Sequence, residues 1–385
     1  MALAPGRVVV SLEAIRSNAR RLIELADGAG LMAVVKANAY GHGLVPVSQA
    51  AMAAGASYLG VAHMGEALAL SQALGPDRVP ILTWIFPDDA PFDQALEAGL
   101  ELGVASRRSL AEVVAAARAT GLTAVVHLKL DTGLGRSGAP QAEWEALVRA
   151  ALAAEATGAI RALGMWSHFA YADSPGHPTV RDQEVAFTEG LALARRLGAR
   201  FEMNHLANSA ALLTGRQVSY DMVRPGIALY GLSPVPDQAS AQDLGLVPAM
   251  RFESELTLTK RVPAGHGISY GHIYHTPKET VTGLVPLGYA DGVFRSASGR
   301  VRVLVGDRLV PQVGRICMDQ FVVDLGPAAT EVGGTPVVLF GSGADGEPTA
   351  QDWAEAAGTI SYDITTRIPP HVPRVYPGDT ASSNL

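Results

Sequence analysis

The sequence predicts an α/β protein in which a (β/α)8 TIM-type barrel is followed by a mostly β C-terminal domain. Two patterns support this prediction. From residue 11 to about residue 235, short apolar runs alternate with longer amphipathic stretches, and this alternation indicates parallel strands that are covered by helices. After about residue 240 the chain consists mainly of strand-like runs, which are separated by Gly, Pro and Asp-Gly turns.

Eight apolar runs provide the strands of the predicted barrel. They lie at 31–36, 58–62, 79–84, 100–106, 124–132, 162–169, 201–207 and 223–231. Helix-like segments separate them, and the segment that precedes the first run has Ser11 as its N-cap and Gly28 near its end. Eight such units fit a closed barrel better than an open sheet. We therefore assign residues 1–240 to the barrel and 241–385 to the β-rich domain, with residues 1–10 as a candidate strand of the latter.

The composition narrows the class of protein. The chain has 385 residues, of which 48% are hydrophobic and 17% charged, as in an ordinary globular protein. Its net charge is -7 and it has no Lys/Arg-rich segment, which argues against nucleic acid or an anionic membrane as a partner. Cys317 is the only cysteine, so a reducing, cytoplasmic location fits best. We expect neither a secretory signal nor a membrane span.

Polar side chains gather where the predicted barrel strands end, which is where barrel enzymes carry their active sites. Lys36 closes the first run, Lys129 lies in the fifth, His168 ends the sixth and Arg224 lies in the eighth. Each has an ordinary structural interpretation, since strand-end lysines are usually solvated and lone histidines usually support packing. Their shared location favours a function instead. The same strand ends also carry Asn38, Tyr40, His42, Asp131, Arg136, Asn208 and Ser209.

The segment "RPGIALYG" in the eighth run is a candidate phosphate-binding site, because it offers backbone N–H groups beside Gly226. A phosphate site, a strand-end lysine and several tyrosines together fit pyridoxal 5'-phosphate. Lysine holds this cofactor as a Schiff base, and the ring accepts electrons from a carbanion. An acidic partner would keep the pyridine nitrogen protonated, whereas an arginine would leave it unprotonated.

The chain resembles the pyridoxal-phosphate-dependent alanine racemases in segments that follow one another in order. These segments are "AVVKANAYGHG", "KLDTGLGRSG", "WSHFAYAD", "NSAALL", "VRPGIALYG", "GISYGHIY", "PLGYADGVFR", "GRICMDQFVVDL" and "GTISYDI". They cover nearly the whole chain, including the β-rich domain. The resemblance implies an isomerase that interconverts L-alanine and D-alanine, supplies D-alanine for peptidoglycan precursors, and requires no metal.

The resemblance also implies how the cofactor is bound and used. Lys36 would carry the cofactor as an aldimine and act as one base, and Tyr270 would act as the other base on the opposite face. Arg224 would face the pyridine nitrogen, with His168 behind it as a hydrogen-bonded support. The other residues that would bind the cofactor are Tyr40, Arg136, Asn208, Ser209, Gly226, Ile227 and Tyr362.

Substrate binding and the active-site entrance follow from the same resemblance. Arg136 and the backbone N–H of Met318 would bind the carboxylate of alanine, and a carbamate on Lys129 would orient Arg136. The family completes its active site across a homodimer, so Tyr270 and Met318 would come from the partner subunit. Further residues that would support the site or line its entrance are Asp173, Tyr289, Arg295, Arg315 and Asp319.

Three alternatives remain at this stage. Basic amino-acid decarboxylases share the architecture and the cofactor, but they place an acidic group where this chain has Arg224. Racemases of broader specificity are expected to carry a signal peptide and paired cysteines. Non-catalytic pyridoxal-phosphate carriers resemble the barrel alone and leave Tyr270, Met318 and the β-rich domain unexplained. Tyr270, taken by itself, fits a tyrosine packed at a turn of that domain.

Overall fold

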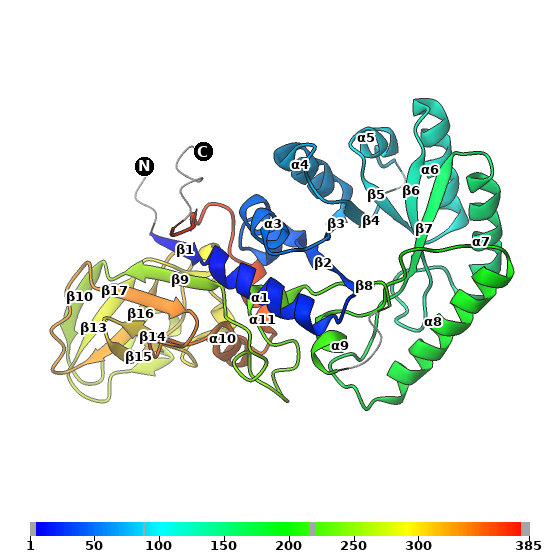
Figure 1. Ribbon diagram of the computed structural model, residues 1–385. Helices are drawn as coiled ribbons and strands as arrows, with labels where there is room; N and C mark the ends of the chain where they lie inside the picture. Colours follow the sequence, from blue (N-terminus) through cyan, green and yellow to red (C-terminus); the bar gives the residue numbers. More distant parts are fainter. Residues whose placement is uncertain (1–4, 88, 216–219, 379–385) are drawn as a thin grey trace.

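A computed structural model describes residues 5–87, 89–215 and 220–378. Figure 1 shows two units, a curled parallel sheet with helices outside it and a second unit built mainly of strands. This arrangement confirms the predicted fold class, a barrel followed by a mostly β domain. No helix in these described ranges is long and apolar enough to cross a lipid bilayer. Residues 1–4 of the candidate N-terminal strand lie outside the described residues.

Within the described residues, the barrel sheet has seven strands, all parallel, in the order β7-β6-β5-β4-β3-β2-β8. Its strands are almost wholly buried because helices cover the outside and side chains fill the inside. The strands are β2 (Gly30–Val34), β3 (Tyr58–His63), β4 (Ile81–Ile85), β5 (Glu101–Val104), β6 (Ala124–Lys129), β7 (Ile160–Trp166) and β8 (Met222–Val223).

The predicted strand at 201–207 is instead an irregular segment that closes the barrel between β7 and β8. On the β7 side, the N–H of His205 donates to the carbonyl of Met165 at 3.0 Å. On the β8 side, backbone hydrogen bonds join this segment to the residues that flank β8. The N–H of Asn204, however, donates to the carboxylate of Asp221 at 2.7 Å. A side chain has thus replaced a neighbouring strand as the acceptor, and a regular ladder cannot form here.

Helices follow most of the barrel strands and pack on the outside of the sheet (Figure 1). In the first, the Ser11 hydroxyl accepts the N–H of Ala14 at 3.1 Å, which confirms the predicted N-cap. The helical segments of the barrel are α1 (Leu12–Leu25), α2 (Lys36–Tyr40), α3 (Leu44–Ala53), α4 (Met64–Leu74), α5 (Phe92–Glu97), α6 (Arg107–Thr120), α7 (Gln141–Glu155), α8 (Pro178–Arg196), α9 (Ser209–Leu213) and the 3₁₀ turn η1 (Ile227–Tyr230).

In the part of the chain that the structure describes, the second sheet has nine strands in the order β10-β13-β16-β15-β14-β17-β9-β1-β18. The early strand β1 therefore lies beside the late strand β18. β1 (Gly6–Val10) runs antiparallel to β9 (Met250–Glu255) and parallel to β18 (Arg374–Val375). The others are β10 (Leu258–Val262), β13 (Thr280–Val285), β14 (Arg302–Val305), β15 (Arg308–Val313), β16 (Phe321–Gly326) and β17 (Pro336–Phe340). Shorter elements are β11 (Gly267–Ile268), β12 (Tyr274–His275), α10 (Ala350–Ala357), α11 (Ser361–Thr366), η2 (Tyr270–His272), η3 (Tyr289–Asp291) and η4 (Arg295–Ala297).

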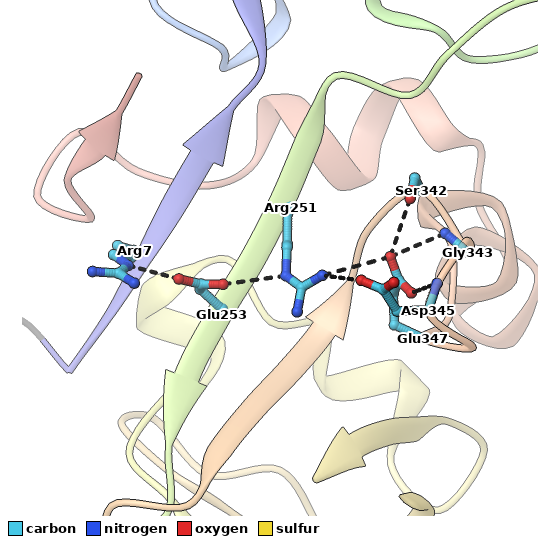
Figure 2. A network of polar contacts seen from close by, with 7 residues as sticks. All are labelled: Arg7, Arg251, Glu253, Ser342, Gly343, Asp345 and Glu347. Carbon is cyan, nitrogen blue, oxygen red and sulfur yellow. Dashed lines mark hydrogen bonds and ion pairs between the residues drawn. The ribbon is translucent and has the colours of Figure 1, made fainter. Parts of the chain in front are cut away.

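A line of charged side chains joins β1, β9 and the loop after β17 (Figure 2). Arg7 Nε donates to Glu253 at 2.7 Å, and Arg251 Nε donates to the other oxygen of Glu253 at 3.2 Å. Arg251 Nη1 then lies 3.1 Å from Asp345 and 3.9 Å from Glu347. The side chain of Glu347 is fully buried, whereas that of Asp345 is 70% exposed. Two carboxylates of one loop therefore face the same arginine in very different surroundings.

The buried carboxylate of Glu347 organises its own loop. It accepts the backbone N–H groups of Gly343 at 3.1 Å and Asp345 at 2.9 Å, and the Ser342 hydroxyl at 3.3 Å. Burial alone would raise the pKa of Glu347, but these N–H groups and Arg251 lower it below its ordinary value. The charged form is therefore the one that the folded loop stabilises.

We expect Glu347→Gln to lower the free energy of unfolding by about 1–3 kcal/mol, since the amide leaves buried donors with one acceptor fewer. Asp345→Asn is the matched control, and its effect should stay within about 0.5 kcal/mol because an exposed ion pair contributes little. Urea denaturation at pH 7 measures both. Equal losses in the two variants would contradict this explanation.

Candidate active site

A cavity of about 380 Å³ lies at the ends of the barrel strands where the predicted site residues meet. Four basic side chains line it, namely Lys36, Lys129, Arg136 and Arg224. Among the described residues, no Asp or Glu lines it. Because four cations converge with no carboxylate between them, the cavity favours an anionic ligand.

The backbone after Lys36 adopts a conformation that is rare for non-glycine residues. Residues 37–40 have φ values between 52° and 56°, so they form a left-handed helical turn. The carboxylate of Glu66 accepts the N–H groups of Ala37 at 3.2 Å and Asn38 at 2.8 Å. Such strained turns persist where the surrounding structure holds them, and they are concentrated at functional sites.

The two lysines of the cavity have lowered pKa values. Burial, followed by the charge of Arg136, lowers the pKa of Lys36, while Glu66 opposes the shift. Burial and then the charges of Arg224 and Arg136 lower the pKa of Lys129 to about 7. Lys129 Nζ donates to Ser137 Oγ at 2.6 Å and lies 4.2 Å from the ring centre of Trp166. Near neutral pH a substantial fraction of Lys129 is therefore an uncharged amine.

Arg224 is buried, and several acceptors fix its guanidinium. It donates to the carbonyl of Ser167 at 2.6 Å and lies 3.0 Å from Nδ1 of His205. Nδ1 of His168 is farther away, at 3.4 Å. Burial lowers the pKa of Arg224 to about 9, which still leaves it charged at pH 7. Burial and then Arg224 lower the pKa of His168 well below its ordinary value, so this ring is neutral.

The opposite end of the cavity is built from backbone N–H groups and hydroxyls. Ser209 Oγ accepts the N–H of Gly226 at 2.9 Å. A side-chain Cβ at position 226 would lie 2.2 Å from the hydroxyl of Tyr40, so only glycine fits beside that ring. Burial raises the pKa of Tyr362 to about 12 and also raises that of Tyr40. Both hydroxyls are therefore protonated and can donate to an anion. Asn208 and Ile227 also line this end.

Two family models together match most of the chain. The family model "Alanine racemase, N-terminal domain" matches residues 10–234, and "Alanine racemase, C-terminal domain" matches residues 249–376. The chain belongs to the alanine racemase family. Racemases are isomerases, and the chain is accordingly an amino-acid racemase. The resemblance inferred from its motifs is confirmed.

Individual alanine racemases are similar to the chain along its whole length. One from Streptomyces coelicolor is 53% identical over 378 residues, which cover 97% of this chain and 96% of that protein. The crystal structure of alanine racemase from D-cycloserine-producing Streptomyces lavendulae superposes with a TM-score of 0.95 at 49% identity, covering 98% of each chain. The alanine racemase of Bacillus anthracis with bound L-Ala-P gives 0.86 at 34% identity, covering 98% of this chain and 96% of that one.

Most other predicted residues of this racemase lie away from the cavity, in the β-rich unit. Loops 269–273, 288–292 and 315–319, which we call the C-terminal loop cluster, contact one another. Ser269 Oγ donates to the carbonyl of Arg315 at 2.7 Å, and the N–H of Tyr289 donates to the carbonyl of Cys317 at 3.0 Å. Tyr270 is 70% exposed and Met318 53%. Asp319 is exposed within this cluster.

Two further predicted residues lie apart from the cavity lining. Arg295 is exposed and is the first residue of η4. Ser298, which follows η4, connects it to loop 315–319, because its hydroxyl accepts the N–H of Ile316 at 3.0 Å. Burial is the larger cause of the raised pKa of Tyr362, and the nearby charge of Asp173 raises this pKa further. The structure thus brings eleven predicted residues to the cavity and leaves the C-terminal loop cluster, Arg295 and Asp173 outside its lining. The eleven are Lys36, Tyr40, Lys129, Arg136, His168, Asn208, Ser209, Arg224, Gly226, Ile227 and Tyr362.

Several residues that shape the site were not predicted. Trp84 and Trp166 line the cavity, Glu66 holds the left-handed turn, and His205 contacts Arg224. His127 was also missed, although it stands two residues before Lys129 in one strand and therefore points to the same side of the sheet. That alternation was the available signal for His127. Glu66 had no such signal, because only the fold brings α4 against the turn.

Lys129 should titrate near pH 7, because the cavity destabilises its ammonium form. The chain has four lysines, Lys36, Lys129, Lys260 and Lys278, so Cε signals of 13C-lysine-labelled protein can be assigned by single substitutions. We expect the Lys129 signal to move from the ammonium position below pH 7 to the amine position above it. The exposed Lys260 and Lys278 provide the comparison. A Lys129 that remains ammonium at pH 9 would overturn the prediction.

Proposed function

We propose that the chain interconverts L-alanine and D-alanine with pyridoxal 5'-phosphate bound in the cavity, using Lys36 and Tyr270 as its two bases. The observation that carries this proposal is the strand-end Lys36 with three further basic side chains, Lys129, Arg136 and Arg224, in a cavity whose described lining has no carboxylate. Membership of the alanine racemase family indicates that the substrate is alanine. The decarboxylase alternative is disfavoured because Arg224 stands at the cavity wall.

The donors of the cavity fit this cofactor. Ser209, Gly226, Ile227 and the hydroxyls of Tyr40 and Tyr362 would bind its phosphate, and the amine of Lys36 would hold it covalently. The space beside Gly226 supports this assignment, because a Cβ there would collide with Tyr40. When bound, pyridoxal phosphate supplies a ring that accepts the electron pair left on Cα after a proton is removed.

Arg224 would set the behaviour of the pyridine nitrogen. A guanidinium has donors only, and Arg224 is charged at pH 7 because its pKa is about 9. Arg224 would therefore donate to the pyridine nitrogen and keep it unprotonated. This arrangement limits electron withdrawal into the ring and favours return of a proton to Cα over side reactions.

Racemisation needs two proton-transfer groups, because the proton leaves one face of Cα and returns to the other. Burial and Arg136 lower the pKa of Lys36, which brings its amine closer to the working range of a general base. Tyr270 would supply the opposite face. The loop that carries Tyr270 lies against the guanidinium of Arg315, because a Cβ added to Gly271 would lie 3.1 Å from Nη1 of Arg315. This cation can stabilise the phenolate of Tyr270.

Arg136 would bind the carboxylate of alanine, together with the N–H of Met318. The loop that carries Arg136 is held by Asp131, whose carboxylate accepts the N–H groups of Gly133 at 2.9 Å and Gly135 at 3.1 Å. We propose that the amine form of Lys129 takes up CO2 as a carbamate, whose negative charge would orient Arg136. This assignment requires the titration near pH 7 described above, since only the amine reacts.

A homodimer would complete the site. Tyr270 and Met318 are highly exposed, and Ile273 and Tyr289 of the same loop cluster are exposed by 51% and 42%. Apolar side chains gathered on one face are typical of a protein interface. We therefore propose that the C-terminal loop cluster of one subunit covers the cavity of its partner and that neither subunit alone has both bases.

Purified protein supplied with pyridoxal phosphate should racemise L-alanine in a chiral assay. Borohydride reduction should attach the cofactor to Lys36 alone of the four lysines, as read by peptide mass spectrometry. Lys36→Ala should lower activity about a thousandfold or more, because it removes a base as well as the covalent anchor. Attachment to Lys129 or to an exposed lysine would sink the assignment.

A mixed dimer tests whether the site is shared between subunits. Lys36→Ala and Tyr270→Ala chains should each be nearly inactive as homodimers. If they are co-expressed, half of the dimers are mixed and each holds one intact site, so activity should return to about a quarter of the wild-type value.

The control for this experiment pairs Lys36→Ala with the double variant Lys36→Ala/Tyr270→Ala. Mixed dimers of this pair have no intact site and should remain inactive. Activity that fails to return in the first pair, despite dimers isolated through two different tags, would show that both bases belong to one chain.

A further inference from the structure

A chain of buried polar side chains crosses the barrel interior from Arg224 to the start of β5. Arg224 Nη1 lies 3.0 Å from Nδ1 of His205, and Nε2 of His205 lies 3.0 Å from Nδ1 of His127. Nε2 of His127 then lies 2.8 Å from the carboxylate of Glu101. Both histidines are fully buried, and Arg224 and Glu101 are exposed by only 5% and 9%. Three successive contacts therefore join the cavity wall to a carboxylate on another strand.

Arg224, which only donates, and the carboxylate of Glu101, which accepts, favour the same direction for every hydrogen bond in this chain. Because a guanidinium only donates, Nδ1 of His205 must accept, and the proton of that ring is on Nε2. This proton is donated to Nδ1 of His127, which places the proton of the second ring on Nε2 as well. The last donor then faces an oxygen of Glu101. A single arrangement of protons satisfies all three contacts.

A charged imidazolium does not fit this chain. A doubly protonated His127 would donate to Nε2 of His205 and move the proton of that ring to Nδ1, where it would oppose the donor of Arg224. Burial and then the charge of Arg224 lower the pKa of His205 well below its ordinary value, in agreement with a neutral ring. The charged ends of the chain are thus Arg224 and Glu101, with two neutral rings between them.

Aromatic neighbours and nearby charges define the surroundings. Trp166 stacks on His205 with ring centres 5.6 Å apart, and Tyr58 meets the edge of His127 at 6.5 Å. Arg78 and Arg161 lie close enough to Glu101 for its charge to act on them. Arg161 itself pairs with the exposed Glu202 at 2.7 Å. Among the described residues, His127 is the hydrogen-bond partner of the Glu101 side chain.

We propose that Glu101 and His127 are positioning residues that act through His205 to fix the orientation of Arg224. Glu101 holds the proton of His127 on Nε2, and His127 in turn holds that of His205 on Nε2. Nδ1 of His205 is then always an acceptor for the guanidinium. The consequence for the cofactor rests on the proposed function, but the arrangement of protons does not.

The protons can be located in the protein without cofactor. We would label histidine with 15N, assign the two rings with His127→Gln and His205→Gln, and record which ring nitrogens are protonated. Both rings are expected to carry a single proton, on Nε2. A proton on Nδ1 of either ring, or an imidazolium at pH 7, would overturn the proposal before any variant of Glu101 is made.

Two substitutions at Glu101 separate the hydrogen bond from the charge. Gln keeps an acceptor oxygen for His127, so Glu101→Gln should leave both rings protonated on Nε2. Leu has no acceptor, so Glu101→Leu should shift part of the population of both rings to Nδ1. Glu202→Gln, which removes an exposed carboxylate near the same end of the barrel, is the matched control and should change neither ring. Unchanged rings in Glu101→Leu would also overturn the proposal.

The loaded enzyme provides the second readout. Glu101→Leu should lower kcat about ten- to a hundredfold, by analogy with the loss seen when the hydrogen-bond partner of a metal-binding histidine is removed, with the KM for alanine within about twofold. Glu101→Gln should restore most of kcat. If the Leu and Gln variants lose activity equally although their rings differ, the link to Arg224 is wrong. If the wild-type enzyme does not racemise alanine, the proposed function fails, and the positions of the ring protons still decide this inference.

Discussion

The site depends on one constraint, which is that several positive charges must be held together at the mouth of an apolar barrel. Burial lowers the pKa of Lys36, Lys129 and Arg224, and neighbouring cations lower the pKa values of the two lysines further. The protein stabilises Arg224 with the carbonyl of Ser167 and the nitrogen of His205 instead of a carboxylate. An anion that enters the cavity therefore meets cations that no acidic side chain has already neutralised.

The backbone around Lys36 shows how both units of the molecule support this cavity. Glu66 of α4 holds the start of the left-handed turn through two N–H groups. The end of the chain holds the residues that follow the turn, since Arg374 Nε donates to the carbonyl of Gly41 and Tyr376 Oη to that of His42, both at 3.0 Å. The position of the lysine is thus determined by contacts from two distant parts of the sequence.

The sequence was most informative where local patterns carry the answer. Buried parallel strands and the Ser11 cap were predictable because periodicity and capping are local. The strand at 201–207 was wrong because an apolar run does not show that Asp221 will take the N–H of Asn204. Glu101, which forms the buried contact with His127, was missed because that contact depends on the register between β5 and β6. Side-chain partners that come from different strands appear only in three dimensions.

The pairing of β1 with β9 and β18 has a consequence for how the protein is made. β1 leaves the ribosome well before its two neighbours, which are about 240 and 365 residues further along the chain. Tyr362 and Thr366, which line the cavity, also emerge late. A nascent chain that already contains every barrel strand still exposes both edges of β1 and has an incomplete cavity. Synthesis must therefore reach α11 before the site can be completed, and β18 before both edges of β1 can pair.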